Sequence, residues 1–475
     1  MIKLFKSTEI ILTNDLRLFV LSIALSIPAV ILSENLLFVI PVVIIIMMSF
    51  TLGERFIIGI IIISLFTLIG ELSTSLRSVI HLVDFTLLGI LFLKRFGLNF
   101  NSYQQIPKSL WYFIVLYFSA MIISAVMSKY PSAGIGAIAQ QAAFFVIVYV
   151  FYSLIQDEND IKNYFRAIVV VSCIIVTILM ISFFREGFDL LMIISKNRTR
   201  VSAITGNIEA ATNFIVVSFP LVIMDLLLKK KSSDKIFNWF LLFFFSLGLT
   251  LAISRSAIIG IIISTSVLFI ILRRKLFYKF FAYLFIIALL FLLIEPLSEL
   301  AFFFFRVEEG LSTRDYIWTM SLNMIRDYPI FGIGPGAYKY EMFNYFPFML
   351  DDWYGKLYIL FYEVTGGVNL SHNFFLVFFT EMGILGILTA FALPVVYFRI
   401  GIKTIKKFRN ASSDKYYLIV ALFAAGTSII ARNLFNSIGL LYVGGIQTDL
   451  PFWLIFGSLV YFYRVPLAVS TSIND

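Results

Sequence analysis

Long runs of apolar residues, separated by short polar or charged clusters, fill most of this 475-residue sequence. A run of roughly 20 apolar residues is long enough to cross about 30 Å of hydrocarbon as an α-helix. Hydrophobic residues make up 60% of the chain and charged residues only 14%, which is far from the balance of a water-soluble protein. The sequence therefore predicts an all-α polytopic integral membrane protein.

Fourteen segments fit this pattern, and because several are short we expect about 12–14 transmembrane helices. They lie at residues 17–32, 35–52, 55–70, 78–93, 109–127, 134–155, 164–184, 209–228, 237–253, 256–272, 277–294, 373–398, 416–431 and 451–463. The first opens a series of similar spans, so we expect a membrane helix there and not a cleaved signal peptide. The predicted organisation is transmembrane helices with short loops over 1–294, one large extracytoplasmic loop over 295–372, and C-terminal transmembrane helices over 373–475.

Basic residues alternate in density between successive loops. With the N-terminus in the cytoplasm, 24 of the 37 Lys and Arg residues fall on the cytoplasmic side, in line with the positive-inside rule. Both termini then lie in the cytoplasm, and the loop over 295–372 lies outside. The net charge of +9 therefore reflects topology and predicts no nucleic-acid partner.

Metal-ligating side chains are scarce. Cys173, the only cysteine, lies in an apolar run, which excludes disulfides within the chain and thiolate metal clusters. His81 and His372, the only histidines, lie far apart in the sequence. We expect no metal site and no cofactor.

Several cations remain on the predicted outer side. Arg255, in "LAISRSAIIG", interrupts two apolar runs at the outer end of a hairpin, where an arginine is costly and marks a candidate functional site. Arg198 and Arg200 precede the helix expected at 209–228, and Arg432 opens an outer segment at 432–450. The alternatives are an arginine that reaches lipid phosphates and a solvated basic loop.

The large loop contains a predicted amphipathic helix. It begins after Ser312 or Thr313, carries Ile317, Leu322 and Ile325 at near-helical spacing, and ends before Pro329. It is too short to span, so we expect it to lie along the outer membrane surface. Arg314 lies in its first turn, with Trp318 one turn later on the same face.

A glycine-rich turn and several aromatic residues follow this helix. "GIGPGAY" places three glycines, Gly334 and Gly336 among them, within five residues, but it lacks the strand and lysine of a phosphate-binding loop. Tyr338, Tyr340, Tyr345, Trp353 and Tyr354 are suited to stacking on sugar rings and equally to a membrane-interface belt.

His372, in "NLSHNFF", is predicted at the last outer position before a long membrane helix. An unperturbed imidazole has a pKa of about 6.5, so it can accept a proton near neutral pH. An interfacial side chain without function is the alternative. Arg255, Arg314 and His372 fall on one predicted membrane face, which favours a site for an anionic, pyrophosphate-like group beside an activated nucleophile.

Three motifs in this order resemble the superfamily of O-antigen ligases and Wzy-type polymerases: "ISRSA", "TRDYIWTMSLNMIRDYPIFGIGPGAY" and "LSHNFFLVFFTEMGILG". The resemblance covers about residues 250–388. The segment "ITGNIEAATNF" is similar to a Gly…Asn-Pro-Asn stretch of the family, but Ile208 and Glu209 stand where the family often has Pro and Asn.

The resemblance implies a GT-C-like, metal-independent, inverting glycosyltransferase in the bacterial cytoplasmic (inner) membrane, with its active site on the extracytoplasmic face. Its implied partners are undecaprenyl-pyrophosphate-linked oligosaccharide as donor and acceptor, membrane lipid and a possible regulator of chain length. Carried over by position, Arg255, Arg314 and His372 are the expected catalytic residues, with His372 as general base or as a positioning group. The expected substrate-binding residues are Arg198, Arg200, Trp318, Gly334, Gly336, Tyr338, Asn373 and Arg432.

Three functions remain in competition. A polymerase joins lipid-linked repeat units into a capsule, exopolysaccharide or O-antigen chain; we favour it because the chain is long for a ligase. A ligase transfers the glycan to lipid A core, protein or wall polymer. A lipid-linked oligosaccharide flippase or other transporter would need polar residues within the spans and a site near mid-membrane, whereas these spans have few charges at their middles.

Overall fold

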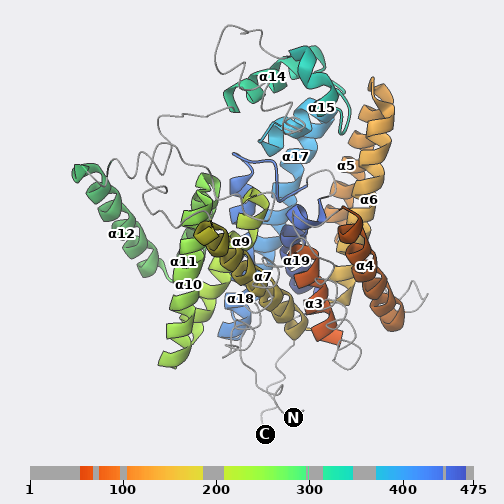
Figure 1. Cartoon of the computed structure of the whole chain (residues 1–475). Coiled ribbons are helices and arrows are strands. Elements are labelled where there is room, and N and C mark those ends of the chain that lie inside the picture. The colour runs from red at the N-terminus through yellow and green to blue at the C-terminus, as the bar shows by residue number, and fades with distance from the viewer. Residues whose placement is uncertain are drawn as a thin grey trace.

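The computed structural model describes residues 54–67, 74–96, 104–185, 208–229, 231–295, 298, 314–345, 371–441 and 445–466. The secondary structure of this part of the chain consists of helices and includes no strand, which confirms the predicted all-α polytopic fold (Figure 1). The helices predicted at 17–32 and 35–52 lie outside the described residues.

The helices observed match the predicted spans in number and order over the described residues. They are α3 (Glu54–Thr67), α4 (Thr74–Phe96), α5 (Lys108–Met127), α6 (Pro131–Leu154), α7 (Glu158–Arg185), α9 (Ile208–Leu228), α10 (Ser232–Ala252), α11 (Arg255–Leu272), α12 (Arg274–Leu293), α17 (Phe374–Lys407), α18 (Ser413–Arg432) and α19 (Ile446–Arg464). Within the described part, nine of these are long and apolar enough to cross a membrane: α5, α6, α7, α9, α10, α11, α12, α17 and α18. Many extend past the predicted ends because a helix continues into its polar flanks, where the hydropathy pattern stops.

The helix ends lie on two opposite faces of the molecule. On one, which we call the basic face, Arg55 bonds to Asp157 and to Asp160 at 2.7 Å, and Lys415 lies 3.8 Å from Glu158. Each of these residues lies at a helix end that the charge pattern assigns to the cytoplasm. The opposite face, called the loop face, carries α14 (Arg314–Asp327) and α15 (Tyr338–Glu341) above the start of α17 (Figure 1).

The most deeply buried helices are α7, α9 and α18, and α11 packs against the latter two. Phe214, Leu221 and Leu422 are inaccessible to solvent in this core. By contrast, α12 has no buried residue and leans away from the bundle, in contact with α11 (Figure 1). The core therefore positions the helices on which the loop face rests, while α12 is peripheral.

The loop face has a small hydrophobic core of its own. The helix predicted before Pro329 is α14, and its buried residues pack against the glycine turn, α15 and the 3-10 helix η5 (Met342–Tyr345). The prediction that Leu322 shares the apolar face with Ile317 is wrong, because Leu322 is 56% exposed while Met320 and Met324 are buried. The core consists of Ile317, Met320, Met324, Ile333, Ala337, Tyr338 and Met342.

The glycine turn docks on a break in α17. Gly383 has φ 60° and ψ −147°, which interrupts the helix. The carbonyl of Thr380 accepts a hydrogen bond from Ile333 N–H at 3.0 Å, and Ile384 N–H donates to the carbonyls of Pro329 at 3.0 Å and Ile330 at 3.2 Å. In an unbroken helix Ile384 N–H would donate to Thr380. The loop backbone thus supplies a donor for the Thr380 carbonyl and acceptors for Ile384 N–H, in place of the helical hydrogen bond between them.

Helix α5 supports the same junction from the membrane side. Ser124 Oγ donates to the carbonyl of Glu381 at 2.7 Å, and Ser128 Oγ donates to the carbonyl of Ile333 at 2.6 Å. The backbone of Gly334 passes so close that a Cβ there would lie 2.2 Å from Ser128 Oγ. Ser124 therefore binds α17 at the break, and Ser128 binds the glycine turn that docks there.

We expect Gly383→Ala to destabilise the protein by about 3 kcal/mol or more, because of its left-handed φ and a clash with backbone. A Cβ there would lie 2.2 Å from the carbonyl oxygen of Ile330. The measurement is thermal unfolding in detergent, followed with a thiol-reactive fluorophore at the buried Cys173.

The matched control is Gly136→Ala in α6, where a Cβ would meet nothing within 4 Å. This variant should be as stable as wild type, or more stable by up to about 1 kcal/mol. Equal stability of the two variants would show that the break does not depend on glycine.

Candidate functional site

Arg255 is the first residue of α11, directly after a tight hairpin turn. Ile253 closes α10 in a left-handed conformation with φ 44°, and the Ser254 side chain accepts a hydrogen bond from Ala257 N–H at 3.4 Å. Arg255 is half-buried. A cation at a helix N-terminus opposes the helix dipole, so this position is unfavourable for stability unless an anion also lies there.

Arg432 ends α18 and lies wholly inside the bundle, next to the turn that carries Arg255. Its guanidinium donates to Asn213, to Thr212 Oγ1 at 2.9 Å and to Ser256 Oγ at 3.2 Å. Gly260 makes room for it, since a Cβ there would lie 3.0 Å from Arg432 Cγ. The side chain therefore ties α9 and α11 to α18, immediately behind Arg255.

His372 lies where the sequence predicts it, just before the first turn of α17. Asn373 is the N-cap, and its side-chain oxygen accepts from Phe375 N–H at 2.9 Å and Leu376 N–H at 3.0 Å. His372 is half-buried and has φ 50°, a left-handed conformation that is strained for a residue with a Cβ. The backbone at this histidine is thus held in an unfavourable conformation by its surroundings.

The start of α17 is fixed to the end of α18. Asn373 Nδ2 donates to the carbonyl of Leu434 at 2.8 Å. Phe374 N–H donates to the carbonyls of Asn433 at 3.1 Å and Asn436 at 3.0 Å. Since Asn433 follows Arg432, these contacts connect the His372 backbone to the buried arginine and, through Ser256, to the α11 N-terminus.

Helix α14 approaches the same place from above. Trp318 Nε1 donates to the carbonyl of Ser371 at 2.9 Å, which joins the first turns of α14 to the residue before His372. Arg314, one turn earlier on α14, is half-buried. Arg255 and Arg314 are the first residues of α11 and α14, and His372 precedes the N-cap of α17. A chain of contacts through Trp318, Asn373 and Arg432 links these three helix starts, each of which carries the positive end of a helix dipole. Such an arrangement is suited to an anionic ligand.

The predicted substrate-binding residues are distributed unevenly around this region. Trp318, Asn373 and Arg432 lie at it, as described above. Gly334 and Gly336 have φ 112° and 70° and shape the turn between the loop and the α17 break. Arg198 and Arg200 lie outside the described residues.

The predicted aromatic residues have different environments. Tyr338 is fully buried, and its hydroxyl lies 3.0 Å from Ser321 Oγ. Tyr340 is 45% exposed and stacks on Tyr130, with ring centroids 5.1 Å apart. Tyr345 donates to Asp327 Oδ2 at 2.7 Å, while Trp353 and Tyr354 lie outside the described residues. Of the three described rings, Tyr340 presents the largest open surface to a ligand, and Tyr338 is placed to support the loop core.

Glu381 is a further residue of this region, outside the predicted site residues. It is buried beside the break in α17, and its carboxyl lies near the backbone N–H groups of Gly336 and Tyr338. The backbone carbonyl of Glu381 accepts a hydrogen bond from Gly334 N–H at 2.9 Å, which attaches the glycine turn to α17. In the sequence, Glu381 is the only charged residue of the apolar run "FFTEMGILG", and an ionisable residue in such a run indicates a candidate functional or structural site.

The contact between the α5–α6 connection and the loop is ionic and aromatic. Lys129 Nζ lies 3.5 Å from Glu341 Oε1 and 5.2 Å from the centre of the Tyr328 ring. The Tyr328 hydroxyl and the Glu341 carboxylate raise the pKa of Lys129.

Among the described residues, no group of three or more His, Cys, Asp or Glu side chains is arranged to hold a metal ion.

Residues 240–391 match the Wzy_C family model, described as O-Antigen ligase. The matched segment contains Arg255, Arg314 and His372. This match confirms the resemblance to the O-antigen ligase and polymerase superfamily that the three sequence motifs carry. No curated protein matches the chain significantly.

The strain at His372 leads to a prediction about stability. His372→Gly and His372→Ala both remove the imidazole, but only glycine adopts φ 50° without cost. We expect the glycine variant to be more stable than the alanine variant by about 1 kcal/mol. Thermal unfolding followed at Cys173 measures the difference, and a glycine variant less stable than the alanine variant would contradict the left-handed conformation.

Proposed function

We propose that this chain, whose residues 240–391 match the O-antigen ligase family, is a membrane glycosyltransferase that takes oligosaccharide from a polyprenyl pyrophosphate. The observation that carries the proposal is the chain of contacts that links the starts of α11, α14 and α17, where Arg255, Arg314 and His372 lie. Positive helix ends and guanidinium groups together favour a doubly charged phosphate group. A lipid-linked donor supplies such a group next to the sugar to be transferred.

In the proposed reaction the acceptor hydroxyl attacks the anomeric carbon as the bond from that carbon to the pyrophosphate oxygen breaks. His372 accepts the hydroxyl proton, and Arg255 and Arg314 stabilise the charge that develops on the leaving pyrophosphate. One displacement inverts the configuration at the carbon. Because arginine keeps its charge at physiological pH, these residues make a metal ion unnecessary.

The neighbours of these three residues are proposed to position them. Trp318 holds the carbonyl of Ser371, Asn373 caps α17, and Arg432 fixes Ser256 beside Arg255. Arg198 and Arg200 are proposed to add further contacts to the anionic donor. In this arrangement Arg432 acts through the protein and does not itself reach substrate.

Two acceptors are consistent with this chemistry. We favour a polymerase, in which the acceptor is a second undecaprenyl-linked unit and the product is a capsule, exopolysaccharide or O-antigen chain. The description of the matching family supports the alternative, a ligase that transfers the glycan to lipid A core, protein or wall polymer. The excess of cations on the basic face supports a bacterial cytoplasmic membrane protein whose candidate site faces outward.

The direct test uses purified protein in liposomes with polyprenyl-pyrophosphate-linked repeat units from the native host. We expect a polymer ladder from wild type and a rate lowered about 100-fold or more in His372→Ala and in Arg314→Ala. Added imidazole should restore part of the rate to His372→Ala, as expected for a lost proton acceptor. Arg326→Ala, at the exposed end of the same helix, is the matched control and should retain the wild-type rate.

The products separate the two acceptors. A ladder from the donor alone identifies a polymerase, whereas transfer that needs a second acceptor identifies a ligase. Full activity of a folded His372→Ala variant would overturn the assignment of this residue as general base.

A further inference from the structure

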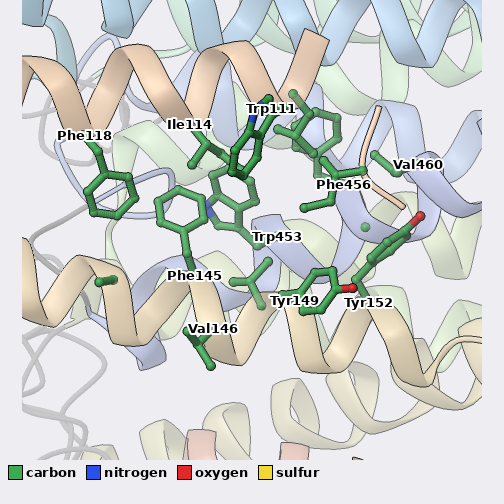
Figure 2. Close-up of a pocket in the computed structure, with 15 residues that line it drawn as sticks. Trp111, Ile114, Phe118, Phe145, Val146, Tyr149, Tyr152, Trp453, Phe456 and Val460 are labelled. Atoms are coloured by element: carbon green, nitrogen blue, oxygen red, sulfur yellow. The ribbon is translucent and has the colours of Figure 1, made fainter. Parts of the chain in front are cut away.

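An apolar groove of about 310 Å³ lies between α5, α6 and α19. Figure 2 shows Trp111, Ile114 and Phe118 on one helix facing Phe145 and Tyr149 on another, with residues of α19 between them. The groove is open at its side, since Trp111 is 53% and Val146 62% exposed. A bilayer surrounds the helices in a membrane, so this opening faces lipid.

The groove lies in the half of the bundle next to the basic face. Its α5 residues run from Leu110 to Phe118, just after the α5 start, and its α19 residues end at Val460, one turn before Arg464. The candidate site lies at the other ends of the helices, where Ser124 and Ser128 of α5 hold the loop. An occupant of the groove and a ligand at the candidate site therefore belong to opposite leaflets.

The lining offers hydrocarbon and aromatic surface and few free polar groups. Tyr149 donates to the carbonyl of Gln104 at 3.0 Å, Tyr152 to that of Gln105 at 3.1 Å, and Trp453 Nε1 to that of Leu440 at 2.7 Å. These polar atoms are thus engaged by the protein backbone. A flexible hydrocarbon chain fits such a surface, whereas a polar ligand would find few partners.

Two cations lie at the basic-face end of the groove. Lys108 is exposed at the start of α5, and Arg464 donates to the carbonyl of Gln105 at 2.7 Å and to Tyr152 Oη at 3.2 Å, which holds it at the rim. In the described part of the chain neither forms an ion pair with a carboxylate.

The acidic residues nearby already have cationic partners. Arg55 bonds to Asp157 and Asp160, and Lys162 lies 2.8 Å from Glu158. Within the part of the chain that the structure describes, Lys108 and Arg464 therefore leave positive charge at the mouth of the groove.

We propose that this groove binds one hydrocarbon chain of an anionic phospholipid, with the lipid phosphate beside Lys108 and Arg464. The apolar lining selects the chain, and the two cations select an anionic headgroup over a zwitterionic one. The lipid lies in the leaflet opposite the candidate site, so it is distinct from the glycan donor. Its binding does not depend on the function proposed above.

Tryptophan quenching by brominated lipid tests the proposal on the full chain in vesicles. Trp453 lines the groove and is 3% exposed, so lipid bromine reaches it through the groove. At equal mole fraction we expect phosphatidylglycerol with brominated chains to occupy the groove about fivefold more than brominated phosphatidylcholine. The readout is the part of the quenching that disappears in Trp453→Phe.

Paired variants show whether groove and cations act as proposed. Ala142→Phe fills the groove and should abolish the preference, whereas Ala143→Phe, at an adjacent exposed position off the groove, should preserve it. Lys108→Gln combined with Arg464→Gln should make the two lipids equivalent.

Equal quenching by both lipids in wild type overturns the proposal. So does displacement of the brominated lipid by undecaprenyl phosphate but not by unlabelled phosphatidylglycerol, since the occupant would then be a carrier lipid.

Discussion

Inside a membrane, a backbone N–H or C=O without a hydrogen bond costs several kcal/mol, so an interrupted helix needs replacement partners. The break at Gly383 meets this constraint with the loop itself. Ile333 N–H binds the Thr380 carbonyl, and Ile384 N–H binds carbonyls just before the turn. Loop and membrane helix therefore form one hydrogen-bonded unit. The position of α14, and with it Arg314 and Trp318, follows from this junction.

The candidate site rests on a second polar connection within the bundle. Burying the Arg432 guanidinium is costly, and its two terminal nitrogens offset part of that cost by donating to Asn213, Thr212 and Ser256. Removing one partner would leave a buried charge less well compensated, so the network specifies one arrangement of α9, α11 and α18. The strained backbone at His372 is attached to this rigid frame by the contacts of Asn373 and Phe374. Strain at a candidate catalytic residue persists only where the surroundings enforce it in this way.

The sequence predicted the spans well because twenty-residue apolar runs have few structural alternatives in lipid. It also predicted α14, from its caps and Pro329, and the place of His372 before α17. The break in α17 was not predictable, since Gly383 lies in an apolar run that reads as continuous helix. The burial of Tyr338 and the exposure of Leu322 depend on tertiary packing against the glycine turn, which helical spacing alone does not encode. The charge pattern predicted Arg432 on the outer side. Its bonds to α9 were not predictable, because they join residues more than two hundred positions apart in the sequence.

The exchange of hydrogen bonds at Gly383 also has a consequence for biogenesis. The turn at Gly332–Gly336 precedes α17 in the chain, so it leaves the ribosome before its partner carbonyls at Thr380 and Glu381. Helix α17 enters the bilayer as an apolar segment that can satisfy its own backbone as an ordinary helix. The break then forms only when α17, α5 and the glycine turn meet, which makes loop docking a late step in assembly of the chain. Insertion and maturation are thereby separable events, and a chain stopped between them would span the membrane with its candidate site still unassembled.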